Sequence, residues 1–296
     1  MSSKLQNAIK LKEFAFTAEL VPPLSASTRP LLAEAEPLKG LVHAINITDG
    51  AGARTTMSSF AAAAILANHG FEPVLQLTCR DRNRIAITAD LIGAAAQGAH
   101  NLLVLTGDDP KSGDQPEAKP VFDCDSVAVI RLATSMSVPG VIPSGREIEH
   151  PPSFFIGAAD VPQNPGPKWS PEPLTKKADA GAKFIQTQFC YDVEVATRYF
   201  ERLQQEGLTD RLAFLVGIGP IASARSARWM ADNLWGVTIP NSLIDRLENA
   251  NDAKSESLAI CQELIAAYRD IPGIAGVHLM APAQSTSAIA AVLGEL

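Results

Sequence analysis

Short apolar runs alternate with longer amphipathic stretches along most of this chain. An apolar run of four to eight residues between chain breakers is typical of a strand that is buried on both faces, as in a parallel sheet. The runs predict eight strands, at residues 14–20, 42–48, 73–78, 102–107, 153–157, 184–188, 212–217 and 275–279. The stretches between them predict helices at 30–38, 55–69, 83–97, 124–136, 171–180, 192–206, 223–233, 241–269 and 282–295.

Three of the predicted helices end at a glycine that leads directly into a strand, namely Gly70, Gly98 and Gly181. Glycine is favoured at a helix C-terminus because it adopts the left-handed conformation without the cost that other residues incur. The strand that follows each of these glycines ends in polar residues, for example Thr78 and Gln188. In parallel α/β folds the carboxyl ends of the strands carry the chemistry. The pattern therefore predicts an active site at these strand ends.

The alternation of strands and helices favours an α/β fold with a parallel sheet. Eight strands in 296 residues suggest closure into a (β/α)8 TIM barrel, a single domain over residues 1–296 with extra loops and helices. A doubly wound open sheet is the alternative, but no glycine-rich nucleotide-binding motif follows any strand. Segments 107–123 and 138–152 are long and rich in Pro, Gly and charged residues, which predicts functional lids or ligand walls.

The composition is that of an ordinary soluble protein, with 46% hydrophobic and 19% charged residues. A net charge of −7 and the lack of long Lys/Arg clusters argue against nucleic acid as a partner. The first residues lack an apolar signal-peptide core, and no apolar run approaches the length of a membrane span, so we expect a cytoplasmic protein. Four scattered cysteines predict reduced thiols.

The predicted barrel brings the polar strand ends to one mouth. In chain order they are Glu19, Thr48, Asp49, Gln76, Thr78, Thr106, Asp108, Thr187 and Gln188. Carboxylates and neutral hydrogen-bonding groups without a His/Cys cluster indicate a pocket for a polar organic ligand rather than a metal. The five histidines share no ligand spacing, so a core or surface role is expected for each.

Glu19 is the sharpest candidate because it lies inside an apolar strand and just before Pro22 and Pro23. A carboxyl group in such surroundings is expected to keep its proton near neutral pH, which suits a general acid. The alternative is a glutamate that faces solvent or pairs with a lysine. Asp108 has a similar alternative, in which it or Asp109 only caps a turn.

For two charged segments a structural role is favoured over a binding role. Residues 80–83, Arg-Asp-Arg-Asn, could bind an anion, but a solvated start of a helix is favoured. Lys176 and Lys177 lie near the end of a helix, where cations are favourable for the helix dipole alone.

Several of these residues stand in ordered motifs that resemble the methylenetetrahydrofolate reductase family. The similarity covers roughly residues 14–220 and rests on order and spacing together. The matching motifs are Glu19-Leu-Val-Pro22-Pro23, Ile47-Thr48-Asp49-Gly50-Ala51, Gln76-Leu-Thr78-Cys79, Leu105-Thr106-Gly107-Asp108, and Lys176 to Ala182 followed by Ile185 to Phe189.

The resemblance implies an enzyme of one-carbon metabolism and methionine biosynthesis. It implies that NAD(P)H passes a hydride to bound FAD, and that the reduced flavin then converts 5,10-methylenetetrahydrofolate to 5-methyltetrahydrofolate. By position, Glu19 would be the general acid that opens the imidazolidine ring, and Asp108 would orient the pterin beside the flavin. Gln188 would bind the pterin, and Thr48 would lie against both substrate and cofactor.

The resemblance also implies a set of cofactor-binding positions. They are Thr48, Gln76, Thr106, Gly107, Asp108, Ala158, Ala159, Lys177 and Ala182. This chain departs from the family pattern at several of the FAD positions: Gln76 replaces a histidine, Thr106 an arginine, and the neighbouring Asp49 an aromatic residue.

The departures keep three alternatives open. The first is direct hydride transfer from NAD(P)H to the same folate without flavin. The second is a reductase of another tetrahydropterin, and the third is a non-catalytic folate-binding subunit. The sequence does not distinguish NADH from NADPH. The alanine-rich C-terminal helix would suit packing either on the barrel or on another subunit of a homo-oligomer.

Overall fold

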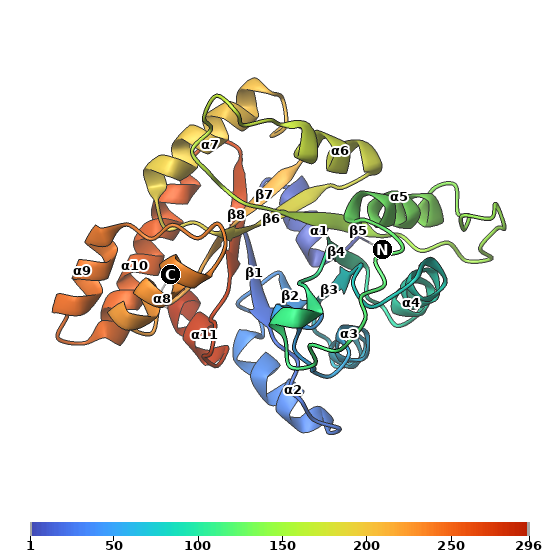
Figure 1. Cartoon of the computed structure of the whole chain (residues 1–296), viewed down its shortest axis with the longest axis horizontal. Coiled ribbons are helices and arrows are strands. Elements are labelled where there is room, and N and C mark those ends of the chain that lie inside the picture. Colours follow the sequence, from blue (N-terminus) through green and yellow to red (C-terminus); the bar gives the residue numbers. More distant parts are fainter. Residues whose placement is uncertain (1, 295–296) are drawn as a thin grey trace.

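All eight predicted strands form, and they close into a parallel barrel in the order of the sequence (Figure 1). The computed structural model describes residues 2–294. The strands are β1 (Ala15–Leu20), β2 (Ala44–Ile47), β3 (Pro73–Thr78), β4 (Asn101–Leu105), β5 (Phe155–Asp160), β6 (Phe184–Phe189), β7 (Ala213–Ile218) and β8 (Ile274–Leu279). Pairing of β1 with β8, in which Thr17 lies opposite His278, closes the ring. The prediction of a (β/α)8 barrel is confirmed.

The helices surround the barrel (Figure 1). They are α1 (Lys4–Lys10), α2 (Thr28–Ala35), α3 (Ser59–Asn68), α4 (Arg84–Ala96), α5 (Ser126–Ser137), α6 (Glu172–Ala180), α7 (Val193–Gln205), α8 (Ala224–Asn233), α9 (Asn241–Asn249), α10 (Ala253–Arg269) and α11 (Ser287–Gly294). Three 3-10 turns accompany them: η1 (Glu36–Leu38), η2 (Ala51–Ala53) and η3 (Pro110–Ser112). Gly70, Gly98 and Gly181 all have positive φ, as the sequence predicted for helix ends.

Helix α1 was not predicted. It buries Leu5 and Ala8 against the interior of the barrel, at the end where the strands begin. Ser3 caps it by accepting a hydrogen bond from the backbone N–H of Gln6, and its hydroxyl donates to Asn101 at the start of β4. Seven residues with only a short apolar face carry too little periodicity to be recognised in the sequence.

Two predicted helices have different bounds. Helix α3 begins at Ser59 rather than at residue 55, because Thr55 binds the carboxylate of Asp114 on another loop. The single helix expected over 241–269 is two helices, α9 and α10, and Asp252 caps the second by accepting from the N–H of Lys254. The last predicted helix was extended to residue 295, which lies outside the described residues.

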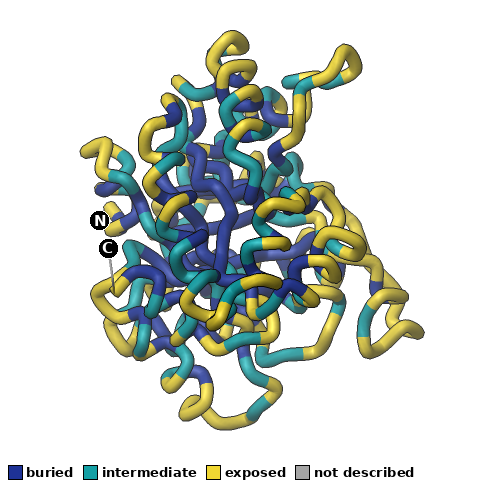
Figure 2. Tube along the Cα trace, turned by 90° about the vertical axis from the view of Figure 1, so that its left-hand side faces the viewer, coloured by how far each residue is buried: buried dark blue, intermediate teal, exposed yellow. Residues whose placement is uncertain are grey.

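The barrel interior is layered, because residues that point inward alternate along each strand. At the end where the strands begin, the inward layer is apolar and includes the stacked rings of Phe155 and Phe184. One layer further, the inward residues are polar but fully buried. A larger apolar cluster fills the space between the strands and the helices. Figure 2 shows the buried strands at the centre and the exposed segments at the periphery.

The two long segments lie at opposite ends of the barrel. Segment 107–123 follows a strand and therefore lies at the carboxyl ends, whereas 138–152 joins helix α5 to strand β5. The second segment turns back on itself, with Val141 paired to Glu147, and projects away from the barrel in Figure 1. The prediction that it forms a ligand wall at the mouth is wrong, because helix-to-strand connections run to the other end of a barrel.

All four cysteines lie in the described part of the chain and are buried free thiols. Over residues 2–294, no helix has both the length and the apolar character that crossing a membrane would require.

Candidate active site

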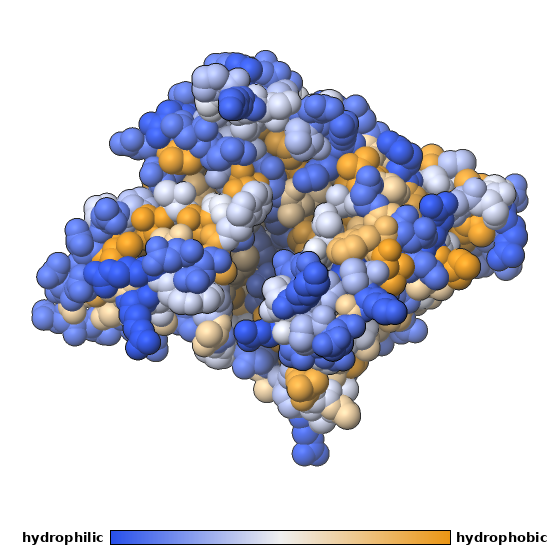
Figure 3. All heavy atoms as spheres, in the orientation of Figure 1, coloured by the Kyte–Doolittle hydropathy of each residue, from blue (hydrophilic) through white to orange (hydrophobic). Residues whose placement is uncertain are grey.

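The carboxyl ends of the strands meet around a hollow on the face seen in Figure 3, where hydrophilic side chains form much of the rim. Glu19 near the end of β1, Gln76 in β3 and His278 in β8 approach one another there. Thr106 and Asp108 after β4 are exposed at the rim, and Gln188 in β6 is half-buried. The structure thus brings most of the predicted strand-end residues to one mouth.

Glu19 is neither a solvent-facing glutamate nor paired with a lysine. One carboxylate oxygen, Oε2, accepts a hydrogen bond of 3.4 Å from the side-chain amide of Gln76. The same oxygen lies 3.9 Å from Nε2 of His278, and the Glu19 side chain is 25% exposed. In residues 2–294 no hydrogen bond or ion pair engages the other oxygen, Oε1. Glu19 is therefore anchored on one side and accessible on the other.

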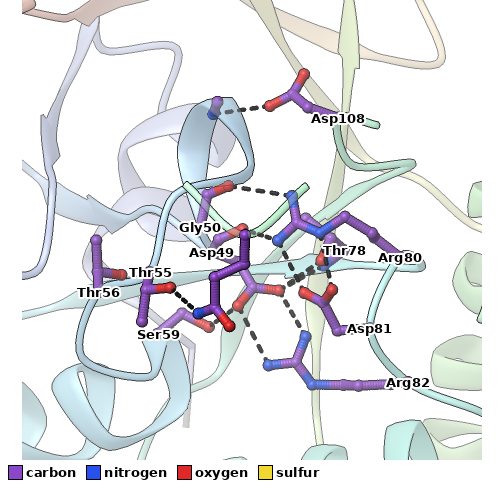
Figure 4. Close-up of polar contacts among 12 residues, drawn as sticks. Asp49, Gly50, Thr55, Thr56, Ser59, Thr78, Arg80, Asp81, Arg82 and Asp108 are labelled. Carbon is purple, nitrogen blue, oxygen red and sulfur yellow. Dashed lines mark hydrogen bonds and ion pairs between the residues drawn. The ribbon is translucent and has the colours of Figure 1, made fainter. Parts of the chain in front are cut away.

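The Asp49 carboxylate is surrounded by hydrogen-bond donors of the protein (Figure 4). It is 7% exposed and accepts two bonds from the Arg82 guanidinium, at 2.7 and 3.2 Å. It also accepts from the N–H and hydroxyl of Thr78 and from the hydroxyl of Ser59. Burial alone raises the pKa of Asp49, but Arg82 and Thr78 outweigh it and hold the pKa below its ordinary value of 3.8.

Arg80 is also committed to the scaffold. It is 5% exposed and its guanidinium binds Asp81 and the carbonyl oxygen of Gly50. A side chain at Gly50, where φ is +61°, would place its Cβ 2.6 Å from this guanidinium. Asn83 caps helix α4, as expected for the start of a helix. The solvated interpretation of residues 80–83 is nevertheless wrong for Arg80, which is buried and paired.

The loop after β4 is pinned onto the loop after β2. Oδ2 of Asp108 accepts from the N–H of Gly52 at 2.8 Å, and Asp114 accepts from the N–H and hydroxyl of Thr55. Asp109, not Asp108, caps the turn η3 by accepting from Lys111. A cavity of about 260 Å³ lies between the two loops. Asp108 therefore keeps one oxygen available at the rim.

On the opposite side of the mouth, β6 supplies Thr187 and Gln188. The Thr187 hydroxyl is tied to the backbone, accepting from the N–H of Gly217. The Gln188 amide oxygen accepts from the N–H of Phe189, and its NH2 group makes a long contact of 3.5 Å with the Trp235 carbonyl. Trp235 itself is 82% exposed. The donor end of Gln188 is thus weakly held and lies at the rim.

Lys177 faces a protein carboxylate and not open space. Its ammonium donates to the carbonyl of Ala159 at 2.6 Å and interacts with Asp160, which also accepts from the Tyr199 hydroxyl. Burial lowers the pKa of Lys177, and Asp160 partly offsets this effect. Burial likewise raises the pKa of Asp160, against the opposing effects of Tyr199 and Lys177. The only described lysine that was assigned to the cofactor is therefore already engaged.

Four of the side chains that the resemblance assigns to FAD are buried or engaged within the protein. The side chains of Ala158 and Ala182 are buried in the core, at 0% and 1% exposure, and Ala159 uses its carbonyl on Lys177. Thr48 is 2% exposed, and its hydroxyl has no hydrogen-bond partner in the described chain. A diphosphate needs cations or free N–H groups, and the one cation among these positions, Lys177, already donates to the carbonyl of Ala159.

Sequence reasoning missed His278, Asp160 and Arg82. His278 carried the same signal as Glu19, a polar residue near the end of a strand, but it was set aside with the other histidines. Asp160 lies at the end of β5, one residue after Ala159, and is also a polar strand-end residue. Arg82 lies in a segment that could bind an anion, but its pairing with Asp49 gave no signal, because a contact across 33 residues is a tertiary one.

A parallel (β/α)8 barrel with a carboxylate-bearing polar mouth defines the class of TIM-barrel enzymes, whose active sites lie at this end. A family model described as methylenetetrahydrofolate reductase matches residues 4–296. The chain belongs to this family, whose named members are oxidoreductases.

Individual relatives agree with this assignment. Methylenetetrahydrofolate reductase 2 of Schizosaccharomyces pombe is 29% identical over 71% of this chain and 32% of its own length. A probable methylenetetrahydrofolate reductase (NADPH) of Caenorhabditis elegans is 26% identical over 84% of this chain and 36% of its own length. The chain therefore spans about a third of the length of these curated relatives.

A solved structure shares the fold over nearly the whole chain. It is described as an uncharacterized protein from Clostridium thermocellum that binds two copies of 5-methyl-5,6,7,8-tetrahydrofolic acid. The TM-score is 0.65 at 16% identity, and the match covers 98% of this chain and 96% of that one.

Proposed function

We propose that this chain reduces 5,10-methylenetetrahydrofolate to 5-methyltetrahydrofolate with NAD(P)H as hydride source, and that it does so as one catalytic domain. The observation that carries the proposal is the geometry of Glu19, a carboxyl group anchored through one oxygen and open to the barrel mouth through the other. The names of the relatives and the folate bound by the structural neighbour support the choice of substrate.

Glu19 acts as the general acid in this proposal. Its proton goes to a nitrogen of the five-membered ring of the folate, the bond from that nitrogen to the methylene carbon breaks, and the other nitrogen forms an iminium with that carbon. The iminium carbon then accepts a hydride and becomes the methyl group. One proton and one hydride are consumed, and NAD(P)⁺ is released. General acid catalysis of this kind contributes about 10²- to 10⁴-fold to a rate.

The rim residues would orient the pterin. Asp108 has one carboxylate oxygen free to accept from the amino and ring N–H groups of a pterin, and Gln188 has its amide NH2 group only weakly held. Asp108 lies on the β4 side of the mouth and Gln188 on the β6 side, so together they would contact a flat heterocycle from two sides. Thr48, which was also expected to contact the substrate, is buried and would need a local rearrangement to do so.

The hydride has two candidate routes. The resemblance predicts a relay through FAD, which remains a prediction. The engagement of Lys177 by Ala159 and Asp160, and the burial of Ala158 and Ala182, favour the second route, in which NAD(P)H and folate meet directly at the mouth. In both routes Glu19 has the same task, so the assignment of the acid does not depend on the route.

The first experiment measures activity and flavin content together. Freshly purified protein is scanned between about 350 and 500 nm, where oxidised flavin absorbs, and is then assayed with 5,10-methylenetetrahydrofolate and NADH or NADPH, with and without added FAD. We expect 5-methyltetrahydrofolate to form without a flavin spectrum. A flavin spectrum and dependence on FAD would support the relay instead. Failure to form product under every condition, with other tetrahydropterins as well, would refute the proposed function.

The second experiment tests the acid. Glu19→Gln is expected to lower kcat by about 100-fold or more while the KM for NAD(P)H changes by less than about threefold. Glu13→Gln, which alters a glutamate at the opposite end of the barrel, is the matched control and should retain full activity. Equal rates for Glu19→Gln and the unmodified protein would exclude the acid role.

A further inference from the structure

A closed hydrogen-bond network fills the barrel directly beneath Glu19. It consists of Thr17, Asn46, Gln186 and His278, which are at most 3% exposed. The side-chain amides of Asn46 and Gln186 bind each other reciprocally, and Gln186 also donates to the Thr17 hydroxyl at 3.0 Å. The Thr17 oxygen in turn lies 3.0 Å from Nδ1 of His278. The last contact of this network is therefore made by Nδ1 of His278.

Counting donors fixes where the imidazole carries its proton. With the amide groups oriented as in this structure, the two hydrogens of the Gln186 amide point to Thr17 and Asn46, so the Thr17 hydroxyl already accepts one bond. The same Gln186 nitrogen also lies 3.5 Å from Nδ1 of His278. The hydrogen of the Thr17 hydroxyl finds its acceptor in Nδ1 of His278; no other acceptor for it occurs in residues 2–294. A ring whose Nδ1 accepts carries its proton on Nε2. The network therefore presents an N–H donor on the side of the ring that faces Glu19.

We propose that His278 is a positioning residue for Glu19, a role that rests on the proposed function. Its Nε2–H faces Oε2 of Glu19 at 3.9 Å, and Gln76 donates to the same oxygen. With the ring and the carboxylate in contact, both donors would bind Oε2 and leave the proton to be transferred on Oε1, which has no hydrogen-bond partner among residues 2–294. A small rotation of the partly exposed Glu19 side chain closes the remaining distance, and catalytic hydrogen bonds often tighten in this way when substrate binds.

His278 has a defined task in the reaction. When Glu19 has given its proton to the folate nitrogen, the carboxylate that remains has two N–H donors on Oε2. Hydrogen bonds to a charged group are stronger than those to a neutral one, so this stabilisation grows as the proton leaves. The imidazole itself does not touch the folate and gains or loses no proton in the step.

The tautomer can be measured without any activity. Long-range ¹H–¹⁵N correlation spectra of uniformly labelled protein distinguish a protonated Nε2 from a protonated Nδ1, and the His278 signals are assigned by their loss in His278→Gln. We expect protonation on Nε2. Protonation on Nδ1 would overturn the proposal. Thr17→Val, which removes the hydroxyl at nearly constant size, should shift the His278 nitrogens more than those of any other histidine and provides a second assignment.

Two amide substitutions separate positioning from packing. In His278→Gln the amide NH2 reaches the place of Nε2, whereas in His278→Asn it reaches only the place of Nδ1. We expect kcat of His278→Asn to fall by about 30-fold, the size expected for losing a bond to a charged group, and that of His278→Gln by much less. The KM for NAD(P)H should stay constant in both. A structural role would make both variants equally poor, and that outcome would overturn the proposal.

His100→Asn serves as the matched control. This histidine lies just before β4, at the opposite end of the barrel, and its substitution should leave kcat unchanged. Failure of the proposed function is distinguishable from failure of this inference. An inactive unmodified protein refutes the former while the NMR measurement still tests the latter, and an active protein with an insensitive His278→Asn refutes the latter alone.

Discussion

Replacing Asp49 with asparagine is the sharpest test of the scaffold beneath the mouth. The carboxylate accepts two bonds from Arg82, two from Thr78 and one from Ser59, and the side chains of Asp49 and Arg82 are only 7% and 16% exposed. Removing one partner of a buried ion pair costs about 3–5 kcal/mol. Arg82 retains Asp90, at 2.9 Å, so we take the lower end and expect a loss of about 3 kcal/mol.

The assay is equilibrium unfolding in urea at about pH 7, with an m-value that matches the unmodified protein. Asp90→Asn is the matched control, because Asp90 is 35% exposed, and it should cost no more than about 1 kcal/mol. A loss below about 1 kcal/mol for Asp49→Asn would refute the reasoning, since it would mean that the buried pair contributes no more than a surface pair.

The same variant has a predicted pH dependence. Because the pKa of Asp49 is lowered in the folded protein from 3.8, its contribution is complete above that value and is lost as the pH falls through the folded-state pKa. The difference between Asp49→Asn and the unmodified protein should therefore be constant near neutrality and shrink below about pH 4. A difference that grew on acidification would contradict the assigned direction.

Two further predictions concern stability. Lys177→Met leaves the carboxylate of Asp160 without its cation and should cost about 2 kcal/mol near neutral pH. Because burial raises the pKa of Asp160, the cost should shrink as the pH falls and the carboxyl takes up its proton, and a pH-independent cost in urea titrations would argue against this. Gly181→Ala should cost about 1 kcal/mol more than Gly70→Ala. Both glycines have positive φ, but only at Gly181 would the new Cβ lie 2.1 Å from the Thr134 hydroxyl. Equal melting temperatures of the two variants would show that this contact relaxes freely.

The strands could be predicted because each is a local signal. An apolar run between breakers needs no knowledge of the rest of the chain, and all eight runs became strands, three of them preceded by a glycine that ends a helix. Helix α1 could not be predicted, since its stability depends on packing Leu5 and Ala8 into the open end of a barrel formed by distant residues. The break between α9 and α10 was missed for a different reason: the Asp252 cap gave a signal, but the apolar periodicity on both sides concealed it.

The site could be predicted as a location but not as a set of contacts. The position of Glu19 follows from strand alternation and could be predicted; whether it acts as the acid remains a prediction. Asp49 looked equally functional in the sequence because it too follows a strand, yet its carboxylate is paired with Arg82. Nothing local in the sequence distinguishes an aspartate that binds a ligand from one that binds an arginine 33 residues away, because the difference lies in the tertiary partner.

The two halves of the mouth differ in how far they are already organised. On the side of β2 to β4, the carboxylate of Asp49 binds Arg82. Asp108 and Asp114 bind the loop after β2, so the loop after β4 is held against it. On the side of β6 and β7, Gln188 has a weak contact with a segment whose Trp235 is exposed. Glu19 and His278 lie between the two halves, on β1 and β8. Glu19, the proposed proton donor, is therefore positioned by contacts with the strands of the barrel and not by the loops around the mouth.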